Sequence, residues 1–219
     1  MRVLVFAPHR DDEVLGVGGT IAKYVKKGHE VFVCEVTDVQ NNRELLEMIK
    51  KEEREAYKVL GIKKSYCLEI PVVELPNFSI IECNRRFLQV VNEVKPNIAY
   101  IPHKGDMHQD HGTVAKSALV ALRPIGNPQL SAIYAYETLS ETEWNAPYVD
   151  NAFVPNVWND ITDEIEIKIK AMKCYESQLC EDVHPRSIET IKALARYRGS
   201  TIGVPYAESF MMIRQILRD

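Results

Sequence analysis

Residues 2–13 read RVLVFAPHRDDE, and this stretch decides the fold. Arg2–Ala7 is an apolar, β-branched run of strand length, which predicts a strand buried inside a sheet. A cluster of ionisable side chains follows at His9–Glu13, and a helical pattern extends from about Gly19 to Lys27. The stretch therefore predicts a strand, a charged loop and a helix in succession.

The same alternation continues along the chain. Apolar runs predict further strands at Glu30–Thr37, Asn97–Pro102 and Ala132–Tyr136. Periodic patterns predict helices at Glu44–Leu60, which Gly61 ends, and at His111–Leu122, Ile161–Leu179 and Ser187–Arg198. Strands that alternate with helices indicate a mostly parallel sheet covered by helices on both faces. We therefore expect an α/β, Rossmann-like fold, with residues 1–219 as a single domain.

Composition excludes several other classes of protein. The 219 residues carry a net charge of −4, and the basic residues are spread out, so we expect no nucleic-acid partner. Apolar stretches are short, which argues against membrane insertion. Five scattered cysteines without a CxxC pair are typical of buried thiols in a reducing compartment. We expect a cytoplasmic protein.

Two polar clusters follow predicted strands, where ligands gather in open α/β sheets. The first is His9-Arg10-Asp11-Asp12-Glu13, and the second contains His103, Asp106, His108, Asp110 and His111. A catalytic zinc site needs three protein ligands, mainly imidazole and carboxylate, and an open position for water. Two histidines and one carboxylate would complete such a site and leave an aspartate and a histidine for proton transfer.

Spacing alone leaves open which of Asp11 and Asp12 binds the metal. Neighbouring side chains point in different directions, so one carboxylate can hold the ion while the other faces its water. The first cluster by itself also fits a helix cap or a solvated turn. The pair of clusters favours metal-assisted hydrolysis.

At these residues the chain resembles the LmbE-like or PIG-L family of zinc-dependent N-deacetylases. Residues 7–13 (APHRDDE) with Gly18-Gly19 resemble the family signature (A/P)HPDDE followed by GG. Residues 106–111 (DMHQDH) match its second signature, D-x-H-x-D-H. The likeness extends to Leu60-Gly61 and to residues 199–210 (GSTIGVPYAESF), so it covers most of the chain.

The resemblance implies a zinc hydrolase that removes an N-acetyl group from an amino sugar of the N-acetylglucosamine type, and a homo-oligomer. It assigns Asp11 as the general base and His108 as the group that stabilises the oxyanion or protonates the leaving amine. Asp110 would orient a histidine, and Asp106 would contact the substrate. The zinc ligands that it implies are His9, Asp12 and His111.

The chain departs from the family at two positions. Arg10 replaces the proline of the first signature, so it could bind an anionic substrate or, as a solvated side chain, pair with Glu13. Ile49 stands three residues before Glu52, where many members carry an arginine. That substitution puts a substrate contact from this helix in doubt.

Alternative functions use the same residues differently. An amidase on this scaffold would cleave a larger amide. A phosphoesterase would hold paired metal ions, whereas only one set of three ligands is evident. A sugar or nucleotide binding module would leave Asp11 and His108 without a role, and Gly16-Val17-Gly18-Gly19 does not fit the dinucleotide GxGxxG spacing.

Overall fold

The computed structural model describes residues 1–40, 42–181 and 183–218, and their strands form one seven-stranded sheet. The strand order is β3-β2-β1-β4-β5-β7-β6. The strands are β1 (Arg2–Ala7), β2 (Glu30–Asp38), β3 (Lys64–Pro71), β4 (Ile98–Pro102), β5 (Ala132–Tyr136), β6 (Val157–Asp160) and β7 (Ala207–Gln215). The five strands β1 to β5 pair in parallel, and β7 runs antiparallel to β5 and β6. The predicted mostly parallel α/β sheet is confirmed.

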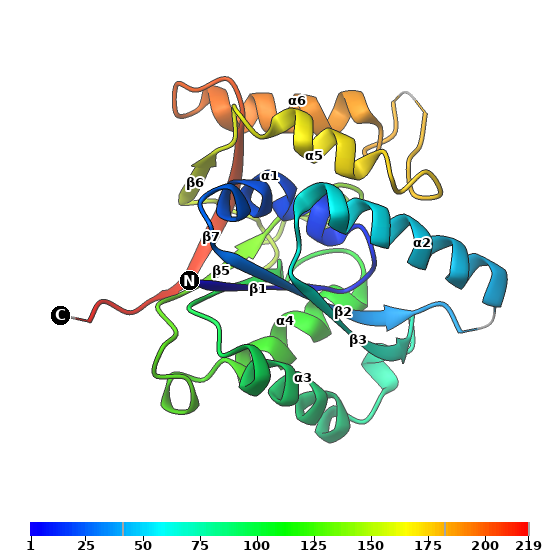
Figure 1. Cartoon of the computed structure of the whole chain (residues 1–219), viewed down its shortest axis with the longest axis vertical. Helices are drawn as coiled ribbons and strands as arrows, with labels where there is room; N and C mark the ends of the chain where they lie inside the picture. The colour runs from blue at the N-terminus through cyan, green and yellow to red at the C-terminus, as the bar shows by residue number, and fades with distance from the viewer. Residues whose placement is uncertain (41, 182, 219) are drawn as a thin grey trace.

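Helices cover both faces of the sheet (Figure 1). One face carries α1, α2, α5 and α6, and the other carries α3 and α4. Among the described residues, no helix combines the length and the apolar content that a bilayer crossing requires. The helices are α1 (Asp12–Lys26), α2 (Arg43–Leu60), α3 (Ile80–Val94), α4 (Gln109–Ala121), α5 (Ile165–Met172) and α6 (Ile188–Ser200), with short 3-10 turns at Leu75–Asn77 and Pro124–Gly126.

The opening strand β1 divides the core into two layers. Residues Val3 to Ala7 are fully buried, and alternate side chains point to opposite faces because the side-chain period of a strand is two. Val3 and Val5 lie in the core layer on the side of α1, on which α5 packs in turn, whereas Leu4 and Phe6 lie in the layer with α3 and α4. Burial on both faces explains why this strand is a continuous apolar run.

The glycines after the first signature allow α1 to lie close to the sheet. A Cβ atom on Gly16 would come within 2.2 Å of the Tyr136 ring, and one on Gly19 within 2.7 Å of Ile161. Tyr136 in turn donates a hydrogen bond to the carbonyl of Phe6. Larger residues at either glycine would push α1, and the loop before it, away from β1.

Several predicted boundaries are corrected. Helix α1 begins at Asp12 instead of about Gly19, because tertiary packing outweighs the low helix propensity of three glycines. Helix α5 covers only Ile165–Met172 of the predicted Ile161–Leu179. Strands β3, β6 and β7 and helix α3 were not predicted from the sequence. Gly61 ends α2 with φ of 74°, as predicted for a glycine after a helix.

The crossovers change direction between β1 and β4. From β1 the chain moves through α1 to β2 on one side, and from β4 it moves through α4 to β5 on the other. A crevice forms at such a switch point, outside the carboxyl ends of the two strands. Both polar clusters of the sequence follow these two strands.

Candidate metal centre and active site

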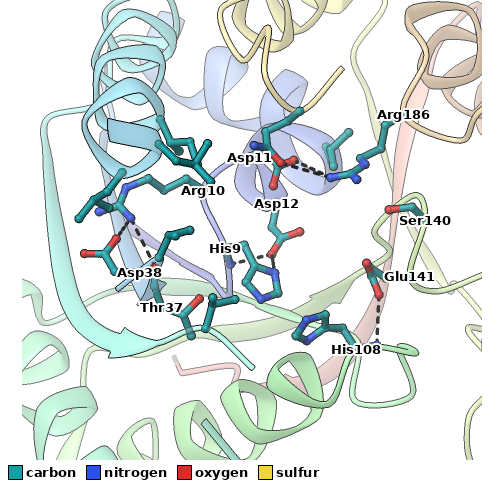
Figure 2. A pocket seen from close by; sticks show the side chains of 17 residues that line it. His9, Arg10, Asp11, Asp12, Thr37, Asp38, His108, Ser140, Glu141 and Arg186 are labelled. Atoms are coloured by element: carbon teal, nitrogen blue, oxygen red, sulfur yellow. Dashed lines mark hydrogen bonds and ion pairs between the residues drawn. The ribbon is translucent and has the colours of Figure 1, made fainter. Parts of the chain in front are cut away.

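The loops after β1 and β4 meet at one cavity of about 360 Å³. Figure 2 shows His9 of the first loop and Asp12 at the start of α1 on the side of His108, whereas Asp11 points toward Arg186. The cavity is also lined by residues from the end of β2, helix α2, the segment after β5 and the loop before α6. Residues that are far apart in the sequence therefore share one site.

Three side chains form a compact triangle of potential ligand atoms. His9 Nδ1 lies 3.3 Å from Asp12 Oδ2 and 3.4 Å from His111 Nε2, and Asp12 Oδ2 lies 3.3 Å from His111 Nε2. In a tetrahedral zinc site with bonds of about 2.0–2.1 Å, two ligand atoms are separated by about 3.3 Å. The triangle therefore has the dimensions expected for three ligands of one small tetrahedral ion.

Each histidine of the triangle faces a buried aspartate with its other ring nitrogen. Asp110 Oδ2 lies 3.2 Å from His9 Nε2, and Asp106 Oδ2 lies 2.8 Å from His111 Nδ1. If each of these nitrogens carries the ring proton, the opposite nitrogen presents its lone pair to the triangle. Thr142 donates to the second oxygen of Asp106 at 2.6 Å. Carboxylates behind metal-binding histidines commonly act in this way.

The electrostatics of the triangle favour a cation. Burial disfavours protonation of His9, but hydrogen bonds to Asp110 and Asp12 outweigh it and raise its pKa to about 9. Burial likewise opposes the charged form of His111, while Asp12 and Asp106 raise its pKa to about 10. Burial opposes ionisation of Asp12, yet the two histidines lower the pKa of its carboxyl. The site therefore attracts positive charge, which a metal ion can supply in place of protons.

Asp11 lies beside the triangle in a strained conformation. It is 4% exposed, its φ is 125°, and its Oδ2 accepts no hydrogen bond from the described residues. Strain of this kind in a residue other than glycine concentrates at functional sites. The nearest cation to this oxygen is Arg186, whose Nη1 lies 3.6 Å away (Figure 2). Burial and the neighbouring Asp12 raise the pKa of Asp11 to about 8.

His108 is the N-cap residue of α4. Its Nδ1 accepts a hydrogen bond from the backbone N–H of Asp110 at 3.2 Å. A neutral ring in this arrangement carries its proton on Nε2. Burial and the nearby His9 lower the pKa of His108 and so favour the neutral ring. Its own backbone N–H donates to Glu141, which also lines the cavity (Figure 2).

Arg10 turns away from the metal triangle into a buried ion-pair network. Its Nε donates to Glu53, its Nη1 donates to Asp38, and its Nη2 lies 3.1 Å from the Cys67 sulfur. The residue is only 6% exposed, so the expected alternative of a solvated arginine paired with Glu13 is wrong. All three guanidinium nitrogens already have partners within the chain.

We expect Arg10→Met to lower the free energy of unfolding by about 3 kcal/mol, because it leaves Glu53 buried without its cation and leaves Asp38 with only Lys50, at 4.0 Å. Urea denaturation would measure the change. The matched control is Arg43→Met at the exposed start of α2, which should change stability by less than about 0.5 kcal/mol. Equal effects of the two substitutions would contradict the buried network.

A buried carboxyl on β2 adjoins the same network. Glu35 is fully buried, its Oε1 accepts from the Tyr57 hydroxyl, and its Oε2 accepts no hydrogen bond from the described residues. Burial and the charge of Glu53 raise the pKa of Glu35 to about 8. Folding therefore favours the protonated form of this side chain.

This pKa predicts that stability falls as the pH rises. Because the folded pKa lies above the unfolded one, the unfolded state releases the Glu35 proton first, and stability is lost between about pH 4.5 and pH 8. The slope from one such group is at most about 1.4 kcal/mol per pH unit. We expect Glu35→Gln to make the fall in stability between pH 5 and pH 8 shallower by this amount, while Asp11, whose pKa is also raised to about 8, keeps its own contribution. Parallel curves for the two proteins would contradict the expectation.

Several residues of the cavity wall were not predicted from the sequence, among them three at its polar end. Ser140, with φ of 74°, and Glu141 follow β5, and Arg186 lies in the loop before α6. The strand-end rule that found the first two clusters also applies to β5 and could have identified Glu141. No local signal marks Arg186, because only the tertiary fold brings its loop to the cavity.

Two other clusters in the described residues also have metal-ligating side chains. His9, His108 and Asp110 form one, in which Asp110 already contacts Nε2 of His9 at 3.2 Å. Asp38, Cys67 and Glu69 form the other, beside the guanidinium of Arg10. We interpret the first cluster as a set of side chains that holds His9 in place in the triangle. In the second cluster the cation of Arg10 already neutralises Asp38.

The fold and the triangle together define an α/β protein with a candidate single-metal centre at the switch point of its sheet. Residues 4–122 match the GlcNAc-PI de-N-acetylase (PIG-L) family, and the chain belongs to this family. The resemblance seen in the two signatures is thereby confirmed.

Individual relatives agree with this membership. The diacetylchitobiose deacetylase of Thermococcus kodakarensis is 28% identical over 97% of this chain and 83% of its own length. The conserved protein TT1542 of Thermus thermophilus superposes with a TM-score of 0.81 at 27% identity, covering 99% of this chain and 96% of that one. The N,N'-diacetylchitobiose deacetylase of Pyrococcus horikoshii gives a TM-score of 0.77 at 28% identity, with coverages of 97% and 83%.

Proposed function

We propose that this protein is a zinc-dependent N-deacetylase that hydrolyses the acetamide of an N-acetylglucosamine-type conjugate. The observation that carries the proposal is the triangle of His9, Asp12 and His111, whose edges of 3.3–3.4 Å fit one tetrahedral ion. Membership of the de-N-acetylase family and the names of the relatives support the choice of an amide as the substrate. When bound, zinc would lower the pKa of a water and polarise the amide carbonyl.

Asp11 and His108 divide the proton transfers in this proposal. Asp11 has a carboxylate oxygen without a hydrogen-bond donor among the described residues, so it is free to accept a proton from the attacking water. His108 presents Nε2–H to the cavity and can donate to the oxygen of the tetrahedral intermediate. Arg186 lies 3.6 Å from Asp11 and holds that carboxylate toward the cavity. The leaving amine then takes its proton from Asp11.

Asp106 and Asp110 act as positioning residues in this scheme. Each contacts a histidine of the triangle, so orienting the ring is the role we propose for Asp106 instead of substrate contact. For Arg10 we propose support of the loop, because its nitrogens are engaged by Asp38, Glu53 and Cys67. An anionic substrate would then meet Arg186, which is half-buried in the cavity wall beside Asp11.

Acetate release tests the proposal directly. The purified protein loaded with zinc is incubated with N,N'-diacetylchitobiose and with N-acetylglucosamine conjugates, and acetate and free amine are both quantified. We expect equal amounts of the two products, and a preference for N-acetyl over N-hexanoyl sugars would exclude the larger-amide alternative. Release of phosphate from phosphoesters without any acetate would overturn the proposal in favour of phosphoryl chemistry.

The assembly and the location of the protein stay predictions. We propose a homo-oligomer, which light scattering of the purified protein would measure. We propose a cytoplasmic location because its five cysteines form no disulfide, as is usual in a reducing compartment. The single domain over residues 1–219 is a proposal of the same kind, supported by a sheet that draws strands from both ends of the chain.

A further inference from the structure

The cavity has two chemically different ends. Around the triangle its lining is charged and polar, with Asp11, His108, Glu141 and Arg186 (Figure 2). Toward α2 the lining is apolar. This second part, which we call the α2 wall, consists of Val39, Leu45, Leu46, Ile49 and Val72.

Three separate segments build the α2 wall. Val39 follows β2, Val72 follows β3, and the other three side chains come from the first two turns of α2. Leu45, Leu46 and Ile49 share one side of the helix because residues at spacings of three and four are neighbours on its surface. Ile49 is buried, and the leucines are partly exposed in the cavity. Met48, on the same helix, is 44% exposed and does not line the cavity.

The polar and charged side chains nearest to the α2 wall are already paired with one another, and they include Lys50, whose Nζ lies 4.0 Å from Asp38 Oδ2. Asp38 accepts from Arg10, and the remaining nitrogens of Arg10 face Glu53 and Cys67. A sugar hydroxyl placed against the wall would lose its bonds to water without gaining a protein partner. An apolar group in the same place would gain from leaving water. The wall itself therefore favours an apolar group over a second polar ring.

We propose that the natural substrate carries an uncharged apolar aglycone, alkyl or aryl, which packs on the α2 wall while its acetamide reaches the metal triangle. This inference rests on the proposed deacetylase function and adds the substrate class. The cavity volume of about 360 Å³ is near the lower end of the range for small-molecule sites, which suits one sugar ring with one apolar substituent.

The test compares glycosides of N-acetylglucosamine that differ only in the aglycone. Methyl and hexyl glycosides, each as both anomers, are assayed for acetate release, with UDP-N-acetylglucosamine as the anionic comparison. Each methylene that becomes fully buried strengthens binding by about fourfold, so we expect the better hexyl anomer to have a KM at least tenfold below that of its methyl counterpart. Equal KM values, or a preference for the nucleotide-linked sugar, would overturn the inference.

Substitutions in α2 test whether the α2 wall causes the preference for the hexyl glycoside. We expect Leu46→Gln to reduce the hexyl-over-methyl ratio of kcat/KM to about one third or less, and Leu46→Met to retain it. Met48→Gln, on the same helix but outside the cavity, is the matched control and should keep the ratio of the unchanged protein. An unaltered ratio in Leu46→Gln, with folding verified by thermal unfolding, would exclude the α2 wall.

A binding measurement separates this inference from the proposed function. Titration calorimetry of the Asp11→Asn protein with the same methyl and hexyl glycosides needs no turnover. Deacetylation of all glycosides without a preference for the hexyl aglycone would leave the proposed function intact and refute the role proposed for the α2 wall. A tenfold tighter binding of the hexyl glycoside without any deacetylation by the unchanged protein would support the wall and refute the deacetylase.

Discussion

His111→Ala is expected to abolish both bound metal and turnover. His111 is fully buried, and its Nε2 completes the triangle with His9 and Asp12. A site with three protein ligands cannot lose one and retain a small tetrahedral ion at high affinity. We expect zinc content to fall from about one ion per chain to nearly none, as measured by elemental analysis after dialysis. Acetate release should fall below detection.

The control for this substitution is another buried histidine after β4. His103 is 2% exposed, but its Nε2 faces the carbonyl oxygen of Asn151 at 2.8 Å and the residue does not line the cavity. His103→Ala should therefore lower stability while it keeps the zinc. Full zinc in His111→Ala, or equal zinc loss in both variants, would reject the ligand assignment.

Asp11→Asn is expected to keep the metal and to lower kcat by about 10²–10⁴-fold. The amide has nearly the same shape as the carboxylate, but it cannot accept a proton from the attacking water. Asp11 also lies outside the triangle of ligand atoms, so the metal content should remain near one ion per chain. Zinc analysis and steady-state kinetics on one preparation would measure both quantities.

The adjacent aspartate supplies the comparison. Asp12 Oδ2 lies 3.3 Å from both ligand nitrogens, so Asp12→Asn should lose metal as well as activity. If Asp11→Asn loses the metal while Asp12→Asn keeps it, the two roles must be exchanged. If both variants keep metal and activity, neither aspartate has the role proposed for it.

The order of strands and helices could be read from the sequence wherever patterns were strong. The apolar run of β1 is buried on both faces, and the parallel sheet follows from the alternation of elements. The beginning of α1 was misplaced because glycines weaken the local signal, whereas contacts of Gly16 and Gly19 with distant side chains fix the helix. The C-terminal β7 was missed because its partners, β5 and β6, are distant in the chain.

For the candidate site, the sequence by itself determined which residue types gather after β1 and β4, and the strand-end rule placed both clusters in one crevice. Only the tertiary structure gave each side chain its contacts. It brought Asp12 into the triangle, turned Arg10 toward Asp38 and Glu53, and brought Arg186 to Asp11. The physical reason is that pattern and propensity act over a few residues, whereas partners of a buried charge are chosen by packing between segments far apart in the chain.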